Sequence, residues 1–230
     1  MAELIAIVGE SGSGKTTSIR NLDPSKTFII STTGKRPGIK GANKKYPNFS
    51  VQDGKIVGNF FASSNVDQIA KVLQIIDKKM PEITNVIIDD YQYVMGFEAM
   101  DRAKEKSYDK FTDMAQHAYQ VLKAAMNMRP DLNIIVLTHS ENMGDRVTPY
   151  YKMKTLGKML DSVITLEGLF TYVLFTTIQR DDDNRPSYKF ITNSDGTCTA
   201  KTPMGLFNEI YIDNDLDYVV KRIKEYNEED

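Results

Sequence analysis

The sequence has one cysteine, two histidines and no tryptophan among its 230 residues. The single cysteine, Cys198, excludes an internal disulfide and a cysteine-based metal framework, and it fits a reducing compartment. No apolar run approaches the roughly 20 residues of a membrane-spanning helix, and residues 4–8 are too short for the apolar core of a secretory signal. We therefore expect a cytoplasmic protein with no membrane partner.

An excess of charge of either sign is also missing. The 29 basic and 31 acidic side chains leave a net charge of −2, so no overall field attracts nucleic acid and any such binding must use local patches. The composition is that of an ordinary globular protein, and the length suits one domain. We expect residues 1–140 to form a nucleotide-binding core and residues 141–230 to extend it.

The most informative stretch is residues 9–16, Gly-Glu-Ser-Gly-Ser-Gly-Lys-Thr, which has the phosphate-loop pattern G-x-x-x-x-G-K-[ST]. Glycines let the backbone turn tightly and bring its N–H groups close to phosphate oxygens. Lys15 would place a cation on the β- and γ-phosphates, and Thr16 would offer its hydroxyl to a magnesium ion. The residues expected to hold the nucleotide are Gly9, Glu10, Ser11, Gly12, Ser13, Gly14, Lys15, Thr16 and Thr17.

The flanking residues agree with this motif. Residues 4–8 are an uninterrupted apolar run, which is typical of a buried parallel strand. Residues 17–22 can begin a helix that ends before Asp23 and Pro24, and its N-terminus would add favourable N–H groups. Strand, glycine loop and helix is the order that the motif requires.

A second apolar strand over 85–90 ends in two carboxylates. Ligands of open α/β sheets bind at the carboxyl ends of strands, so Asp89 is expected to hold magnesium beside Thr16. Asp90 is the candidate base that orients or deprotonates the attacking water, although it could instead cap the next segment. Glu98 is the second candidate for this base.

A third buried strand is expected over 133–139, ending in Thr138 and His139. A polar side chain at this position can contact the γ-phosphate or the attacking water, so His139 is a candidate catalytic residue; the alternative is a hydrogen-bonded strand end. His117 lies within a long helical pattern and is interpreted as structural.

The remaining pattern predicts an α/β fold with a mostly parallel central sheet flanked by helices and a C-terminal antiparallel extension. Strands are expected over 27–32, 162–167, 171–179 and 187–192, a hairpin turn at Asp53-Gly54, and helices over 65–80, 108–128 and 216–226.

The surface segment 141–158 interleaves cations with aromatic rings. Such a segment suits single-stranded nucleic acid, because cations meet phosphates and rings stack on bases. It could equally be a solvated loop, or Lys154 or Lys158 could reach the nucleotide of a neighbouring subunit. The candidates are Arg146, Tyr150, Tyr151, Lys152, Lys154 and Lys158; a weaker patch of the same kind contains Lys35, Arg36, Lys40, Lys44 and Lys45.

With these motifs the chain resembles the RecA-like ATPases of bacteriophages, especially the Sak-type single-strand annealing proteins, which consist of little more than a RecA core. The resemblance spans nearly all 230 residues. It rests on the N-terminal phosphate loop, the Val-Ile-Ile-Asp-Asp of 86–90, the Leu-Thr-His-Ser-Glu of 137–141, the position of Lys158 before an antiparallel extension, and the segment 200–207.

The resemblance implies magnesium-dependent binding and hydrolysis of ATP, assembly into rings or filaments, and action on single-stranded DNA during phage recombination or replication in the host cytoplasm. Many members of the wider family carry a glutamate at the end of strand two. Here that region reads Ser-Thr-Thr-Gly over 31–34, without an acid, which implies slow hydrolysis.

Two other functions fit the loop. A small-molecule kinase usually has an arginine-rich lid, whereas the arginines of 180–185 flank three aspartates that would repel phosphate. A nucleotide-gated structural or regulatory protein would bind ATP and barely hydrolyse it. The absence of an Asn-Lys-x-Asp guanine motif favours adenine.

Overall fold

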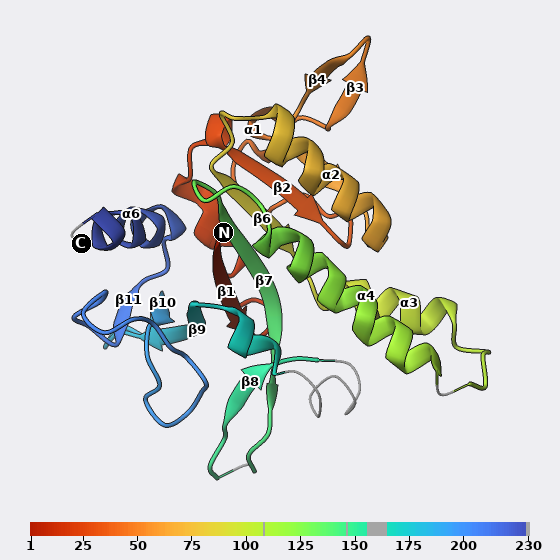
Figure 1. Ribbon diagram of the computed structural model, residues 1–230. Coiled ribbons are helices and arrows are strands. Elements are labelled where there is room, and N and C mark those ends of the chain that lie inside the picture. Colours follow the sequence, from red (N-terminus) through yellow and green to blue (C-terminus); the bar gives the residue numbers. More distant parts are fainter. Residues whose placement is uncertain (108, 146, 156–164, 229–230) are drawn as a thin grey trace.

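The computed structural model describes residues 1–107, 109–145, 147–155 and 165–228 (Figure 1). Within them, nine strands form one sheet in the order β11-β10-β9-β1-β7-β6-β2-β5, with β8 paired to β7. The strands are β1 (Glu3–Gly9), β2 (Thr27–Ser31), β5 (Phe60–Ala62), β6 (Asn85–Asp89), β7 (Asn133–Asn142), β8 (Tyr151–Met153), β9 (Tyr172–Arg180), β10 (Pro186–Ile191) and β11 (Tyr211–Asp213).

The centre of the sheet is parallel. Strand β1 pairs in parallel with both β7 and β9, and β6 pairs in parallel with β7 and β2. The pairs β9–β10, β10–β11 and β7–β8 are antiparallel. The mostly parallel sheet and the antiparallel C-terminal strands are therefore as predicted, and the carboxyl ends of β1, β2, β6 and β7 meet at one edge.

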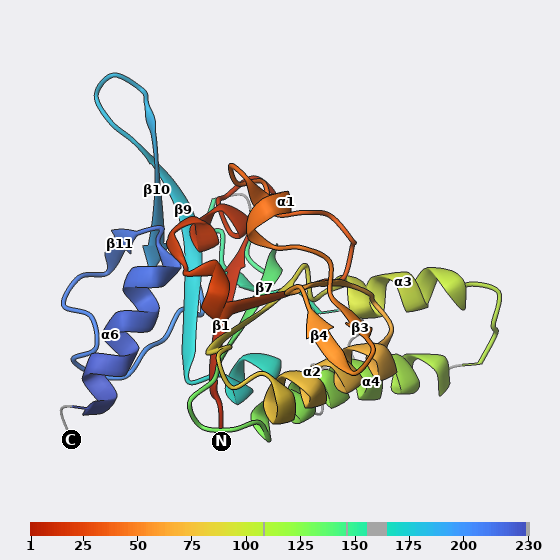
Figure 2. The same ribbon diagram turned by 90° about the horizontal axis from the view of Figure 1, so that it is seen from above.

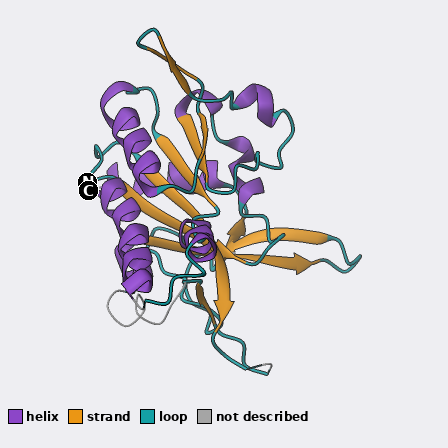
Figure 3. Cartoon of the chain, turned by 90° about the vertical axis from the view of Figure 1, so that its right-hand side faces the viewer, coloured by secondary structure: helices purple, strands orange, loops and turns teal. Residues whose placement is uncertain are grey.

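Two apolar cores explain why these strands contain continuous apolar runs. Alternate residues of β1 point to opposite faces: Ala6 and Val8 contact one core, while Ile5 and Ile7 contact the other. The first core also contains residues of α2 (Val66–Lys79) and α4 (Asp109–Met126), and the second contains residues of α6 (Leu216–Glu228). Helices thus cover both faces of the sheet (Figures 2 and 3).

Local signals fix several boundaries. The side chain of Asn65 accepts a hydrogen bond from the Gln68 N–H, which caps α2 where the sequence predicts. The predicted hairpin joins β3 (Ser50–Gln52) to β4 (Lys55–Val57), and both Asp53 and Gly54 have positive φ, as a type I′ turn requires. A short helix, α1 (Ala42–Lys45), lies in the segment that follows β2.

The segment after the glycine loop is helical and ends before Asp23, as expected, and it is a 3-10 helix, η1 (Thr16–Asn21). The run is short, and the Ser18 hydroxyl takes the Lys15 carbonyl as its acceptor at 2.5 Å, competing with a regular helix. The expected strand over 162–167 has its first three residues outside the described chain, and its end lies in a 3-10 helix, η3 (Leu166–Leu169).

Helix α3 (Tyr93–Asp101) and strand β8 were not expected. None of the helices in the described chain has the length and apolar character needed to cross a bilayer.

Candidate active site

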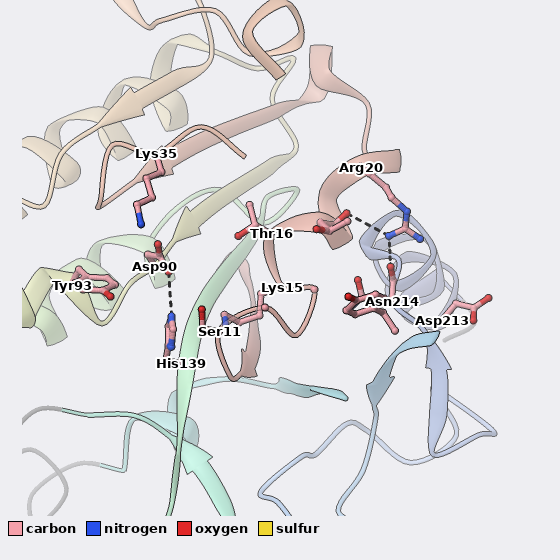
Figure 4. A pocket seen from close by; sticks show the side chains of 14 residues that line it. Ser11, Lys15, Thr16, Arg20, Lys35, Asp90, Tyr93, His139, Asp213 and Asn214 are labelled. Atoms are coloured by element: carbon pink, nitrogen blue, oxygen red, sulfur yellow. Dashed lines mark hydrogen bonds and ion pairs between the residues drawn. The ribbon is translucent and has the colours of Figure 1, made fainter. Parts of the chain in front are cut away.

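A cavity of about 650 Å³ opens at the carboxyl edge of the sheet. The glycine loop forms its middle, with Ser11, Lys15 and Thr16 (Figure 4). One end of the cavity has Lys35, Asp90, Tyr93 and His139, and the other end has Arg20, Asp213 and Asn214. The loop, the acid after β6 and the end of β7 therefore share one cavity, as the parallel strand order predicts.

The backbone of the loop explains its glycines. Gly12 and Gly14 have φ of +80° and +95°, a region that side chains disfavour. A Cβ on Gly9 would lie 1.8 Å from the Thr176 hydroxyl oxygen. The Ser13 hydroxyl donates to the Glu10 carbonyl at 2.6 Å and lies 2.5 Å from the same Thr176 oxygen. Side-chain hydroxyls thus hold the loop against β9.

Lys15 is folded back on the loop. Its ammonium group donates to the carbonyls of Gly9 at 2.9 Å and Glu10 at 2.8 Å. Burial lowers the pKa of Lys15, while the negative charges of Asp90, Asp89 and Glu10 oppose this effect. The cation is therefore held at the loop among acidic groups, where an anionic ligand could replace the two carbonyls.

Asp89 and Thr16 form the candidate metal site. The Thr16 hydroxyl lies 3.2 Å from Asp89 Oδ1 and 3.4 Å from Oδ2. Burial, and then the nearby charge of Asp90, raise the pKa of Asp89 to about 6. A buried carboxylate that lacks full charge compensation, beside a hydroxyl oxygen, fits a hard cation such as magnesium. The described residues contain no cluster of three or more His, Cys, Asp or Glu suited to a metal, so the remaining ligands would come from phosphate and water.

Asp90 has a left-handed backbone with φ of +62°, which turns it out of the strand direction and into the cavity. The Thr33 hydroxyl donates to Asp90 Oδ2 at 3.3 Å, and His139 Nε2 lies 3.6 Å from Asp90 Oδ1. Burial, and then the charge of Lys15, lower the pKa of His139, so the imidazole is neutral at pH 7. The structure brings Lys15, Asp90 and His139 together.

Glu98, the second candidate base, lies elsewhere. It pairs with Arg102 and His117, each at 2.9 Å, and it contributes to a different hollow of about 340 Å³. The same contact places His117 away from the cavity.

Sequence reasoning missed Gln92, a buried residue behind the cavity. Its side-chain oxygen accepts hydrogen bonds from the Thr138 hydroxyl at 3.2 Å and from the His139 N–H at 3.3 Å. Gln92 therefore joins the ends of β6 and β7, and Thr138 serves this contact and does not line the cavity. In the sequence, the only sign of this role for Gln92 is its position two residues after the paired carboxylates Asp89 and Asp90.

The far end of the cavity was also missed. Arg20 donates to the Asn214 carbonyl, which connects η1 to the end of β11. The Asn214 side chain is buried next to Gly14, and neither of its amide atoms has a hydrogen-bond partner among the described residues. No short motif in the sequence signals these contacts.

The segment 141–158 differs from the expected loop. Strand β7 continues to Asn142 and pairs with β8, which places Glu141 opposite Lys152 with 3.3 Å between the charged groups. Tyr150 and Lys154 are exposed, whereas Tyr151 is half-buried. Arg146 and Lys158 lie outside the described residues.

The Lys154 N–H donates to the His139 carbonyl at 2.8 Å, so the ribbon of β7 and β8 begins directly at the cavity. No protein-family model matches this chain, and no curated protein shows a significant match to it.

Proposed function

We propose that this protein is a magnesium-dependent ATPase of the RecA-like type. The observation that carries the proposal is one cavity lined by Lys15, Thr16 and Asp90, with the buried Asp89 carboxylate in contact with the Thr16 hydroxyl. Backbone N–H groups at such a loop, an ammonium group and a metal site are the parts that bind a nucleoside triphosphate.

The residues suit hydrolysis. In our proposal Asp90 accepts a proton from a water molecule whose oxygen forms a bond to the γ-phosphorus. The bond from this phosphorus to the bridging oxygen breaks, its electron pair stays on ADP, and inorganic phosphate leaves. Lys15 compensates charge on the phosphates, and neutral His139 can donate to a γ-phosphate oxygen. Magnesium held by Thr16 and Asp89 would neutralise charge on the β- and γ-phosphate oxygens.

The resemblance to phage annealing proteins extends the proposal to single-stranded DNA and to assembly of several subunits. Support comes from the ribbon of β7 and β8, where exposed Lys154 lies next to the cavity and exposed Tyr150 lies farther along the same ribbon, opposite Met143. His139 lines the cavity, and its carbonyl accepts a hydrogen bond from the Lys154 N–H. A change from ATP to ADP in the cavity can therefore shift the ribbon, and DNA bound to the ribbon can act on the cavity.

ATP hydrolysis measured with and without single-stranded DNA tests both parts of the proposal. We expect turnover by the wild type that DNA increases, no nucleotide binding by Lys15→Ala, and a loss of about 10²- to 10⁴-fold in kcat for Asp90→Asn. Glu98→Gln is the matched control, because this acid lies outside the cavity, and it should keep wild-type turnover.

The outcomes separate the parts of the proposal. Absence of nucleotide binding by the wild type would refute the ATPase assignment. Turnover that ignores DNA, with no DNA retained at low salt, would refute only the nucleic-acid role.

One observation favours a second candidate, a nucleotide-gated regulatory protein with slow hydrolysis. The residues after β2 that approach Asp90 are Thr32 and Thr33, and neither is an acid. Size-exclusion profiles with ADP and with a non-hydrolysable ATP analogue would identify this function if assembly changed while turnover stayed negligible.

A small-molecule kinase is disfavoured. Its lid would need arginines free to contact phosphate, whereas Arg180 and Arg185 interact within their own turn.

A further inference from the structure

The turn after β2 is fastened to the acids at the end of β6. The Thr32 hydroxyl donates to the carbonyls of Asp89 at 3.1 Å and Asp90 at 2.7 Å, and the Thr33 hydroxyl donates to the Asp90 carboxylate. The turn is also closed on itself, because the Ser31 hydroxyl donates to the Lys35 carbonyl at 3.0 Å. The backbone of Lys35 is therefore placed relative to Asp90 by several hydrogen bonds.

Lys35 lines the same cavity as Lys15 and Asp90. Figure 4 shows its side chain extending from the β2 turn toward the end of the cavity that contains Asp90, Tyr93 and His139. Lys35 is exposed, and no ion pair or hydrogen bond of its ammonium group occurs within the described ranges.

Arg36, the next residue, is used differently. Its guanidinium donates to the Tyr46 carbonyl and to Asn48, and it lies 3.8 Å from the centre of the Phe60 ring. Arg36 thus anchors the segment after β2, which leaves Lys35 as the cation of this turn that faces the cavity.

The two ends of the cavity give the bound nucleotide a direction. A nucleoside triphosphate is a linear arrangement of base, ribose and three phosphates, and its phosphates must lie at Lys15 and Thr16 in the middle of the cavity. The terminal phosphate then points toward Asp90, the proposed base, and the nucleoside toward Arg20 and Asn214 (Figure 4). Lys35 lies at the end of the cavity where this orientation places the terminal phosphate.

We propose that Lys35 contacts the γ-phosphate and makes the site distinguish ATP from ADP. This inference rests on the proposed function and adds to it a second cation, supplied from the turn that follows β2, the strand at whose end many of the resembling ATPases carry a glutamate. A cation at this place stabilises charge on the γ-phosphate oxygens both in bound ATP and as the bridging bond breaks. In the absence of an acid at this position, the β2 turn contributes to phosphate binding and leaves proton transfer to Asp90.

Equilibrium binding of ADP and of a non-hydrolysable ATP analogue tests the inference. For Lys35→Ala we expect the affinity for the ATP analogue to fall by about 10- to 100-fold, as for loss of one charge-assisted hydrogen bond. The affinity for ADP should stay within about twofold, since the γ-phosphate is absent. Lys40→Ala is the control, because Lys40 is an exposed lysine of the same segment that does not line the cavity.

Three results would overturn the inference: equal losses for ADP and the ATP analogue, no loss for either, or the same loss in Lys40→Ala. These results differ from failure of the proposed function. If the wild type bound neither nucleotide, the ATPase assignment itself would fail, whereas binding that Lys15→Ala removes and Lys35→Ala leaves unchanged would refute only the role of Lys35.

Discussion

Replacing Asp89 by asparagine should stabilise the metal-free protein at neutral pH and abolish the proposed magnesium-dependent hydrolysis of ATP. The pKa of this carboxyl is raised from its ordinary value of 3.8 to about 6, first by burial and then by the charge of Asp90. A difference of about two pKa units corresponds to about 3 kcal/mol by which the charged form disfavours folding at pH 7. The new amide group needs a hydrogen-bond acceptor, which offsets part of this gain, so we expect a net increase of about 1 to 2 kcal/mol in the free energy of unfolding.

The pH dependence gives the sign of this effect. Because the pKa of Asp89 is higher in the folded than in the unfolded chain, its contribution to stability is most favourable below about pH 4 and is lost as pH rises through about 6. Asparagine does not titrate. The advantage of Asp89→Asn should therefore be present at pH 7.5, close to zero at pH 5, and reversed near pH 4, where only the cost of the amide group remains.

Urea denaturation of both proteins at these pH values, with a chelator present, measures the difference. Asp53→Asn is the matched control, because Asp53 is an exposed aspartate with a positive φ that asparagine also tolerates. Lower stability of Asp89→Asn at pH 7.5, or an advantage that does not change between pH 7.5 and pH 5, would refute the reasoning. Added magnesium should raise the midpoint of the wild type and leave that of Asp89→Asn unchanged.

Three other substitutions test the structure around the cavity. Gly9→Ala should lower stability by about 1–3 kcal/mol, since its Cβ would meet the Thr176 hydroxyl; in thermal denaturation it should contrast with Gly38→Ala, whose Cβ meets nothing within 4 Å. Gln92→Ala removes the acceptor for a hydroxyl and a backbone amide at the end of β7, so it should cost about 1–3 kcal/mol in urea denaturation and reduce kcat; unchanged turnover would show that the end of β7 does not need this support. Asn214→Leu removes two unpaired buried amide atoms and should raise the midpoint of denaturation, and a decrease by more than about 1 kcal/mol would show that the amide is bonded in solution.

The parallel centre of the sheet was predictable because its strands are buried on both faces. Residues 4–8 and 86–88 are apolar without interruption, and the structure contains them within β1 and β6. The phosphate loop could be predicted from the pattern of eight consecutive residues. Each of these signals lies within a short segment, so one sequence alone was enough to detect it.

The elements that were missed depend on contacts that the sequence does not show. Helix α3 has Gly96 at its centre and exposes Phe97 and Met100, so its apolar residues do not mark one face. Strand β8 has three residues and forms only because β7 continues beyond His139.

The same reason applies to the ends of the cavity. Lys35 and Asn214 are 179 positions apart in the sequence, and only the sheet order brings the turn after β2 and the end of β11 to the same edge. The sequence shows both residues, but only the complete strand order shows that they lie at the same cavity.

The position of β1 has a consequence for amide hydrogen exchange. This strand is bonded on both sides and is almost fully buried, so its amides should exchange only when the whole sheet opens. The glycine loop begins immediately after Gly9 and has few main-chain hydrogen bonds. Protection factors should therefore drop sharply between neighbouring residues at this junction, and a ligand that occupied the loop would move that boundary toward η1.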